Sequence, residues 1–298
     1  MDEILKLDTV SQFNTLRGIE TLHPLVSVVD FSKMKLIPQA RANYGFYSVF
    51  LKEAVCGDLK YGCKTYDYQE GTLVFIGPGQ VVGIGNKPGG PLPKGWGLLF
   101  HPDLIRGTTL GHNIKKYTFF SYEANEALHI SEKERQTIMD CFNKINNELR
   151  QSIDKHSKTL IANNIELLLN YCMRFYDRQF ITRSDANRDI LARFERLLDN
   201  YFQSEMVHTA GLPTVKYCAD QLHLSANYFG DLIKKETGKS AQENIQLKIM
   251  AIAKERIFDR SKTLSEIAYE LGFKHPQHFS RMFKNETGQT PNEYRSLN

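Results

Sequence analysis

One segment occurs twice in this chain, and this repeat constrains the fold more than any other feature of the sequence. Residues 215–243 and 264–293 align along their whole length, with one additional residue in the second copy. Both copies contain Glu-Thr-Gly, at 236–238 and at 286–288. Two copies of one pattern predict two copies of the same supersecondary unit.

Each copy predicts two short helices joined by a tight turn. In the second copy, Thr263 and Glu266 have the spacing of a capping box, which begins a helix. Gly272 permits the turn, Pro276 fits the first turn of the next helix, and Gly288 ends it. The apolar face of that helix consists of Phe279, Met282 and Phe283. Such a unit is a DNA-binding helix-turn-helix or a generic helical hairpin, and the matching caps in both copies favour the first.

The second copy also contains a set of apolar, glycine and proline positions with a known pattern. These are Ile267-Ala268, Leu271-Gly272-Phe273, residues 279–284, Gly288, Thr290-Pro291 and Tyr294-Arg295. They closely resemble the signature of the AraC/XylS-type transcription regulators of bacteria. Two positions depart from the family pattern. Lys274-His275 stands where small hydroxyl residues are usual, and His223 replaces the turn glycine of the first copy.

The resemblance implies an α+β multidomain protein. Its C-terminal domain would be all-α, with two helix-turn-helix units joined by a long helix, and would bind double-stranded promoter or operator DNA. Its N-terminal domain would be a cupin-like β-barrel or jelly roll with a helical dimerisation hairpin. The implied partners are DNA, a small-molecule effector, a second copy of the chain and RNA polymerase.

Composition is typical of a globular protein in a reducing compartment. Hydrophobic residues make up 41% of the 298 residues and charged residues 24%, and no apolar run reaches the ~18 residues of a membrane span. The start, Met1-Asp2-Glu3-Ile4, is not a signal peptide. The five cysteines are odd in number and lack a Cys-x-x-Cys pair, so we expect reduced thiols in a cytoplasmic protein. The net charge of +4 is too small to indicate DNA binding by itself.

Residues 25–122 have the texture of short strands. Aromatic or β-branched runs at 26–29, 44–50, 73–76 and 96–100 alternate with Gly/Pro turns, which predicts a barrel or a double-sheet jelly roll. Residues 71–80 resemble the cupin-like sensor domain of AraC relatives. Residues 1–25 show no clear period and are expected to be a flexible arm or an edge strand.

The β segment predicts a small-molecule pocket rather than a catalytic metal site. Its three histidines, His23, His101 and His112, form no His-x-His pair, so we expect no metal, no other cofactor, no catalytic residues and no enzyme. A small barrel can hold one small ligand. The candidate lining residues are Tyr44, Phe46, Phe75, Trp96 and Phe100. The alternative is that these side chains simply form the core.

Residues 131–178 switch to helical periodicity. Ser131 and Glu134 form another capping box, and two amphipathic helices follow, at about 131–150 and 157–178. The candidate dimerisation residues are Ile161, Ile165, Leu168, Leu169 and Cys172. The alternative is that both helices pack on the barrel. The predicted boundaries are therefore a sensor and dimerisation domain at 1–180, a polar linker at 181–187 and a DNA-binding domain at 188–298.

The outward residues of the second helix in each unit are the candidate DNA contacts. Base edges would be read by Ala226, Asn227, Asp231, Gln277, His278 and Arg281, with His275 beside them. Phosphates would be contacted by Ser225, Lys234, Lys235, Ser280, Lys284 and Thr290. A helix from Ala241 to about Phe258, with Ile245, Ile249, Ile252 and Ile257 inward, would join the two units. 

Three function classes fit these observations. The first is a ligand-responsive transcription regulator, and the second is an architectural DNA binder without a ligand. The third is an enzyme, either a cupin-type catalyst tethered to DNA or a repair protein. The missing His-x-His pair and the lack of any cysteine in a Pro-Cys-His setting disfavour the enzyme class.

Overall fold

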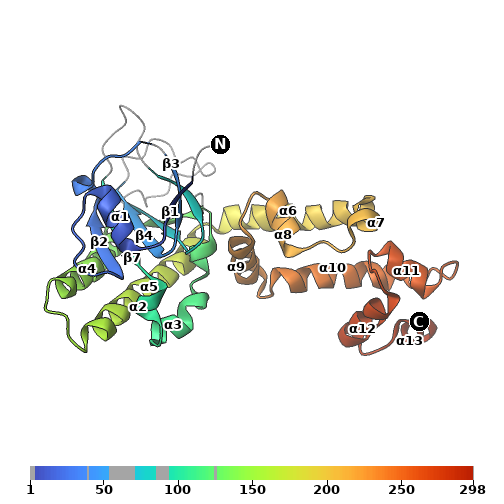
Figure 1. Ribbon diagram of the computed structural model, residues 1–298. Helices are drawn as coiled ribbons and strands as arrows, with labels where there is room; N and C mark the ends of the chain where they lie inside the picture. Colours follow the sequence, from blue (N-terminus) through green and yellow to red (C-terminus); the bar gives the residue numbers. More distant parts are fainter. Residues whose placement is uncertain (1–3, 39, 54–70, 85–93, 124–125, 298) are drawn as a thin grey trace. The chain divides into compact units, whose positions relative to one another are not determined.

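The computed structural model describes residues 4–38, 40–53, 71–84, 94–123 and 126–297. The chain divides into two compact units, Met1–Thr182 and Arg183–Asn298 (Figure 1). The predicted linker, 181–187, contains this boundary. Its residues are helical on both sides of Arg183, in α5 (Ser157–Thr182) and α6 (Ser184–Gln203).

Unit 1 contains two sheets within the described residues. The three-stranded sheet has the order β1 (Ile4–Leu7), β3 (Ala40–Tyr44), β6 (Val81–Ile84), with β1 parallel to β3. The five-stranded sheet is antiparallel, in the order β2 (Val26–Asp30), β7 (Gly95–Phe100), β4 (Tyr47–Lys52), β5 (Gly71–Ile76), β8 (Leu128–Ile130). The predicted β-rich N-terminal region is confirmed.

The predicted run 44–50 is not one strand, and this is a correction. The chain bends at Gly45, so that β3 joins one sheet and β4 joins the other. The Gly45 backbone N–H donates to the carbonyl of Leu7 at 2.8 Å, and a Cβ at Gly45 would lie 2.6 Å from the Asp8 carbonyl oxygen. Only a residue without a side chain allows this close approach.

Helices occupy parts of unit 1 where the sequence indicated none. The segment expected to be an arm or edge strand contains the edge strand β1 and also α1 (Val10–Arg17), which begins with a capping box between Thr9 and Gln12. Two short helices, α2 (Pro102–Ile105) and α3 (Thr109–Asn113), and two 3-10 turns at Ile114–Lys116 and Thr118–Ser121 occupy the end of the segment predicted to be β.

The five-stranded sheet has a hydrophobic core on each face. One core, here called the α1 core, includes Val10, Phe13, Tyr44, Phe46, Ile76 and Leu99. Side chains alternate along a strand, so residues an odd number of positions apart point to opposite faces. Phe75 therefore faces away from the α1 core, because it is next to Ile76. Trp96 and Phe100 also face away from it, because they are three positions and one position from Leu99. There Phe75 and Phe100 pack with Phe120. The five aromatic residues predicted to line one pocket therefore lie on two faces and do not share a cavity, which corrects that prediction.

The two predicted helices after the barrel are present as α4 (Glu132–Leu149) and α5. They pack antiparallel, because the Arg178 guanidinium near the end of α5 contacts the Glu134 carboxylate near the start of α4 at 2.7 Å. The predicted dimerisation residues are all at most 1% exposed: Ile161, Ile165, Leu168, Leu169 and Cys172. They belong to the core of the protomer and are not available to a second copy, so this assignment is corrected.

Unit 2 is entirely helical within the described residues, as predicted (Figure 1). The predicted helix pairs are α8 (Val215–Gln221) with α9 (Ala226–Thr237), and α11 (Leu264–Glu270) with α12 (Pro276–Thr287). The joining helix α10 (Ala241–Arg256) ends slightly earlier than predicted, and Ile252 is only half-buried. Two further helices, α7 (Met206–Ala210) and α13 (Pro291–Leu297), were not predicted from the sequence. No helix among the described residues has the length and apolar character needed to cross a membrane.

Candidate nucleic-acid interface

Side-chain caps determine where three of the four helices in the two helix-turn-helix units begin. The hydroxyl oxygens of Thr214, Ser225 and Thr263 accept backbone N–H bonds at the starts of α8, α9 and α11. The fourth helix, α12, begins at Pro276 after His275, whose side chain makes no capping bond. The departure from the family pattern at Lys274-His275 therefore leaves α12 without a side-chain cap.

The turns of both units contain a residue with positive φ, but the residue type differs. In the second unit Gly272 has φ +88°, and in the first His223 has φ 58°, the one positive value outside glycine among the described residues. A Cβ at Gly272 would lie 3.0 Å from the Gly211 carbonyl carbon and 3.0 Å from Val207 Cγ2. His223 is exposed, so its position has backbone strain but room for a side chain.

We expect His223→Gly to stabilise unit 2. The substitution removes the strain of a left-handed backbone, about 1–2 kcal/mol. Glycine has greater freedom in the unfolded chain, and this offsets part of the gain. The expected net gain is about 0.5–1 kcal/mol in the free energy of unfolding. It would be measured by urea titration, with unfolding monitored by far-UV circular dichroism. His208→Gly is the matched control, because His208 is exposed within α7 and should lose stability. A loss in both variants would contradict this account of the turn.

The second helix of each unit presents polar residues opposite its buried face. On α12, Gln277, His278 and Arg281 are exposed, whereas Phe279 and Phe283 are fully buried. Met282, predicted to be buried, is only half-buried. On α9, Ala226 and Asn227 are exposed and Asp231 is half-buried, while Lys234, Lys235 and, on α12, Lys284 are exposed.

The hydroxyl groups predicted to contact phosphates are already used within unit 2. The Ser225 and Thr290 oxygens accept from the backbone N–H groups of Tyr228 and Glu293, at 3.2 and 3.3 Å. The Ser280 hydroxyl donates to the Pro276 carbonyl at 3.1 Å. Ser225 and Thr290 can still donate their hydroxyl hydrogens to a phosphate, whereas the Ser280 hydrogen is already donated within α12. 

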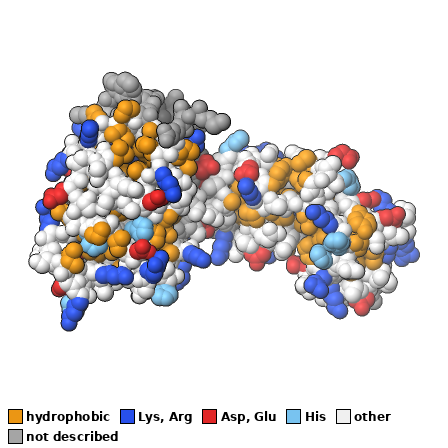
Figure 2. Space-filling view, viewed as in Figure 1, with side chains coloured by type: hydrophobic (Ala, Val, Ile, Leu, Met, Phe, Trp, Pro, Cys, Tyr) orange, Lys and Arg blue, Asp and Glu red, His pale blue; other side chains and the backbone are white. Residues whose placement is uncertain are grey.

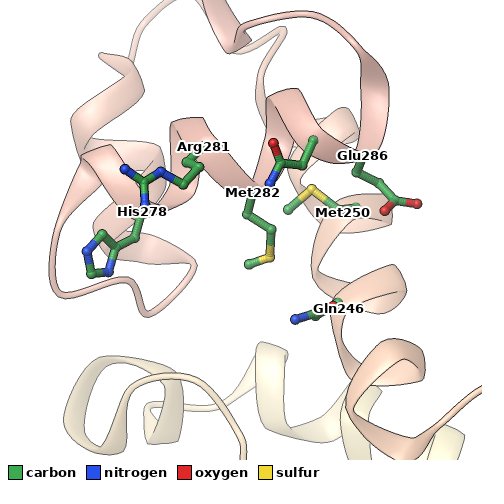
Figure 3. Close-up of a pocket in the computed structure, with 7 residues that line it drawn as sticks. Gln246, Met250, His278, Arg281, Met282 and Glu286 are labelled. Carbon is green, nitrogen blue, oxygen red and sulfur yellow. The ribbon is translucent and has the colours of Figure 1, made fainter.

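A groove of about 400 Å³ lies between α10 and α12, next to the candidate base-reading residues. Its lining residues are Gln246, Met250, His278, Arg281, Met282, Asn285 and Glu286. Figure 3 shows His278 and Arg281 close together and Met282 pointing into the space beside α10. Of these residues, only His278 and Arg281 were predicted from the sequence as DNA contacts. Gln246 and Met250 lie on α10, which no sequence pattern places next to α12.

The surface chemistry of this region suits an anionic partner. Lys and Arg side chains lie among His side chains over the part of unit 2 that contains α12 (Figure 2). The ring centres of His275 and His278 are 5.4 Å apart, and the rings meet edge to face. Among the described residues, no group of three or more His, Cys, Asp or Glu side chains has the arrangement of a metal site.

The second helix-turn-helix unit also contacts residues that belong to neither unit. Helix α7 packs on α11, and the Gly211 backbone reaches the turn at Gly272. The Tyr201 hydroxyl of α6 donates to the Gly211 carbonyl at 2.8 Å. The turn that positions α12 is thus supported by residues that precede the first unit in the sequence.

Comparisons with known proteins concern the same part of the chain. Residues 218–296 match a family model described as a helix-turn-helix domain. The uncharacterized transcriptional regulatory protein YesN of Bacillus subtilis is 39% identical over 85 residues, which cover 28% of this chain and 23% of that protein. The uncharacterized HTH-type transcriptional regulator YobQ of B. subtilis is 35% identical over 83 residues, covering 28% and 34%. The matched region thus spans about a third or less of these two relatives.

Among solved structures, one match has low overall similarity. It is the C-terminal domain of AraT, a response regulator from Geobacillus stearothermophilus, with 27% sequence identity and a TM-score of 0.33. The match covers 37% of this chain and 85% of that one. The family match and the paired helices α8–α9 and α11–α12 fall in the same region. Residues 218–296 of this chain are therefore a helix-turn-helix domain of the AraC type, a domain that the chain shares with transcription regulators.

Proposed function

We propose that this protein is a transcription regulator that binds specific sequences of double-stranded promoter DNA through its two helix-turn-helix units. The observation that supports this most directly is the division of α12 into two faces. Gln277, His278 and Arg281 are exposed near its start, while Phe279 and Phe283 anchor it in the core. A recognition helix uses the outward residues of its first turns to contact base edges in the major groove.

The two units are expected to contribute unequally. Gln and Arg can form two parallel hydrogen bonds to adenine and to guanine, so α12 offers at least two base readers. On α9, Asn227 is the one exposed residue suited to adenine, Gly230 has no side chain, and the Asp231 carboxylate repels phosphates. We therefore assign most sequence preference to α12 and mainly a positioning role to α9.

Selection of binding sites from random double-stranded DNA tests this proposal. The full chain should enrich a motif with one strongly preferred half and one weakly preferred half. A variant with Gln277, His278 and Arg281 all changed to Ala should lose the strong half. Lys133→Ala, on the exposed face of α4, is a control and should leave the motif unchanged. Failure of the unaltered chain to enrich any motif would reject the proposal.

Unit 1 is proposed to sense a small molecule and to mediate self-association, in the cytoplasm and without catalytic residues. The alternative of an architectural DNA binder predicts the same DNA contacts but no response of unit 1 to small molecules. RNA polymerase stays a predicted partner.

The outer face of α5 is the proposed dimer surface, in place of its buried face. Leu160 and Leu167 are 45% and 39% exposed and lie two helical turns apart, and Ile181 is 64% exposed four turns further along. Apolar residues repeated every two turns are the pattern by which helices of two chains pack along each other. Unpaired, these side chains would remain in contact with water.

We expect Leu167→Glu to produce monomers with an intact fold. The carboxylate would lie in the proposed contact, whereas the core of the protomer does not include this side chain. Sedimentation velocity should show a smaller species than the unaltered chain, and operator affinity should fall. Asn143→Glu, exposed on α4, adds the same charge outside the proposed surface and should change neither. An unaltered chain that is monomeric at micromolar concentration, with and without DNA, would rule out this surface.

A further inference from the structure

Helix α1 presents two polar residues to a hydrophobic core. Its inner face consists of Val10, Phe13, Asn14 and Arg17, all at most 7% exposed. Val10 and Phe13 belong to the α1 core, together with Tyr44 and Phe46. Asn14 and Arg17 extend the same face where apolar residues would be expected. A polar group in such a place costs stability unless it is hydrogen-bonded, and a charged group also requires an opposite charge.

The Arg17 guanidinium has no such opposite charge in the described part of the chain. Its Nη1 donates to the Lys35 carbonyl at a long distance of 3.4 Å, and its Cζ lies 5.9 Å from the centre of the Phe13 ring. Its Nε has no hydrogen-bond partner. Burial lowers the pKa of Arg17, but arginine remains charged in proteins because its pKa starts so high. A buried cation without an anion is strongly destabilising.

Other buried polar groups around the α1 core also lack partners. The buried side-chain atoms without a hydrogen bond in the described residues are Asn14 Oδ1, Arg17 Nε and Ser48 Oγ. Ser48 pairs across the sheet with Ile76 and Leu99, two residues of the α1 core, and is therefore on that face of the sheet. Buried polar atoms are nearly always hydrogen-bonded in folded proteins. Three exceptions at one core indicate a missing group rather than three separate defects.

Tyr44 adds a hydrogen-bond donor to this region. It is 1% exposed, and burial raises the pKa of its phenol to about 12, an effect that the nearby Arg17 charge partly opposes. The phenol is therefore protonated at neutral pH. The ring of Tyr44 stacks on Phe46 with centroids 5.0 Å apart, so the surroundings of this donor are aromatic.

We infer that the α1 core binds a small molecule with one carboxylate, which pairs with the Arg17 guanidinium, and with an apolar remainder that contacts Phe13 and Phe46. This rests on the proposed sensor function and names its ligand class. Arginine and carboxylate match in charge and can form two parallel hydrogen bonds. A single guanidinium among aromatic rings balances one negative charge, whereas phosphate at neutral pH would bring an uncompensated second one.

The stability of the full chain without ligand gives a first test that needs no knowledge of the ligand. Arg17→Met replaces the guanidinium by an apolar side chain of similar length, so the Tm should stay equal or rise by about 2–4 °C. Lys35→Met is the matched control, because Lys35 is an exposed cation next to the site and its change should leave the Tm unchanged. A Tm several degrees lower for Arg17→Met alone would show that the guanidinium stabilises the fold unaided, and would overturn the inference.

A second test uses defined probes on the full chain. Benzoate, phenylacetate and octanoate at millimolar concentration should raise the Tm, whereas benzamide, phenylacetamide and inorganic phosphate should not. Arg17→Met should reduce the affinity for the effective carboxylate at least tenfold, and Lys35→Met should not change it. Equal effects of acids and amides, an undiminished effect in Arg17→Met, or no effect of any carboxylate would each overturn the inference. The motif enriched from random DNA is measured without these probes, so a failure here leaves the DNA-binding proposal standing.

Discussion

Arg281→Ala should weaken binding to the preferred DNA sequence by about 1–3 kcal/mol, roughly 5- to 150-fold, and should relax the preference at one base pair. Arg281 is exposed on α12, one turn beyond Gln277 and His278, and opposite the buried Phe283. Its planar guanidinium can donate two parallel hydrogen bonds to the O6 and N7 atoms of one guanine. The loss should therefore be larger on the preferred sequence than on unrelated DNA.

Lys284→Ala is the contrasting variant for this experiment. Lys284 is exposed near the end of α12, where a single ammonium group suits a phosphate rather than a base edge. Its loss should weaken all sequences alike and reduce the slope of affinity against salt concentration by roughly one. Both variants and Lys133→Ala would be titrated against the selected and an unrelated duplex across a salt series. If Arg281→Ala weakened both duplexes equally while Lys284→Ala altered base preference, the placement of α12 in the groove would be wrong.

Gly272→Ala should destabilise unit 2 by roughly 2–5 kcal/mol, because two costs add. The backbone at φ +88° strains any residue with a side chain by about 1–2 kcal/mol. The new methyl group would also press on the Gly211 backbone and on Val207, both at 3.0 Å, and such overpacking costs about 1–3 kcal/mol. Urea unfolding by circular dichroism measures the loss, and DNA affinity should fall with it because this turn positions α12.

Gly288→Ala separates the two costs. Gly288 ends α12 with φ +76°, and a Cβ there would have no atom within 4 Å. This variant should lose only the backbone strain of about 1–2 kcal/mol, reduced in part by the smaller freedom of alanine in the unfolded chain, and therefore less than Gly272→Ala. Equal losses at both positions would mean that the contact between the turn and Gly211 has no energetic role.

Sequence reasoning succeeded where the signal is local. The capping boxes predicted at Ser131 and Thr263 both form, and the structure has another at Ser240; in each, the glutamate three residues later is bonded to the cap backbone at 2.6–2.9 Å. These motifs involve residues within one turn, so no distant part of the chain can change them. The repeated glycine after Glu-Thr ends both α9 and α12 in the left-handed conformation, as predicted.

It failed where the decisive partner is far away in the sequence. Helix α1 has a capping box of its own, but Asn14 and Arg17 interrupt the apolar period of its inner face, so the pattern did not indicate a helix. Helix α5 has apolar residues on two faces, and only the packed structure shows that Leu168 faces the core and Leu167 faces water. The division of residues 44–50 between two sheets depends on contact with Asp8, which no local pattern reveals.

If the protein binds DNA as proposed, the continuity of α10 has a consequence for its target sites. The helix contains neither glycine nor proline and begins with a capping box at Ser240. Ile245 and Ile249 are fully or almost fully buried. We therefore expect α10 to be rigid and to hold the two helix-turn-helix units at a fixed distance. One additional base pair between the two contacted grooves would rotate one groove by about a tenth of a turn relative to the other. Target sites are therefore expected to vary in base sequence in the half contacted by α9 but to have a constant length. A search of promoters should use a motif of fixed width.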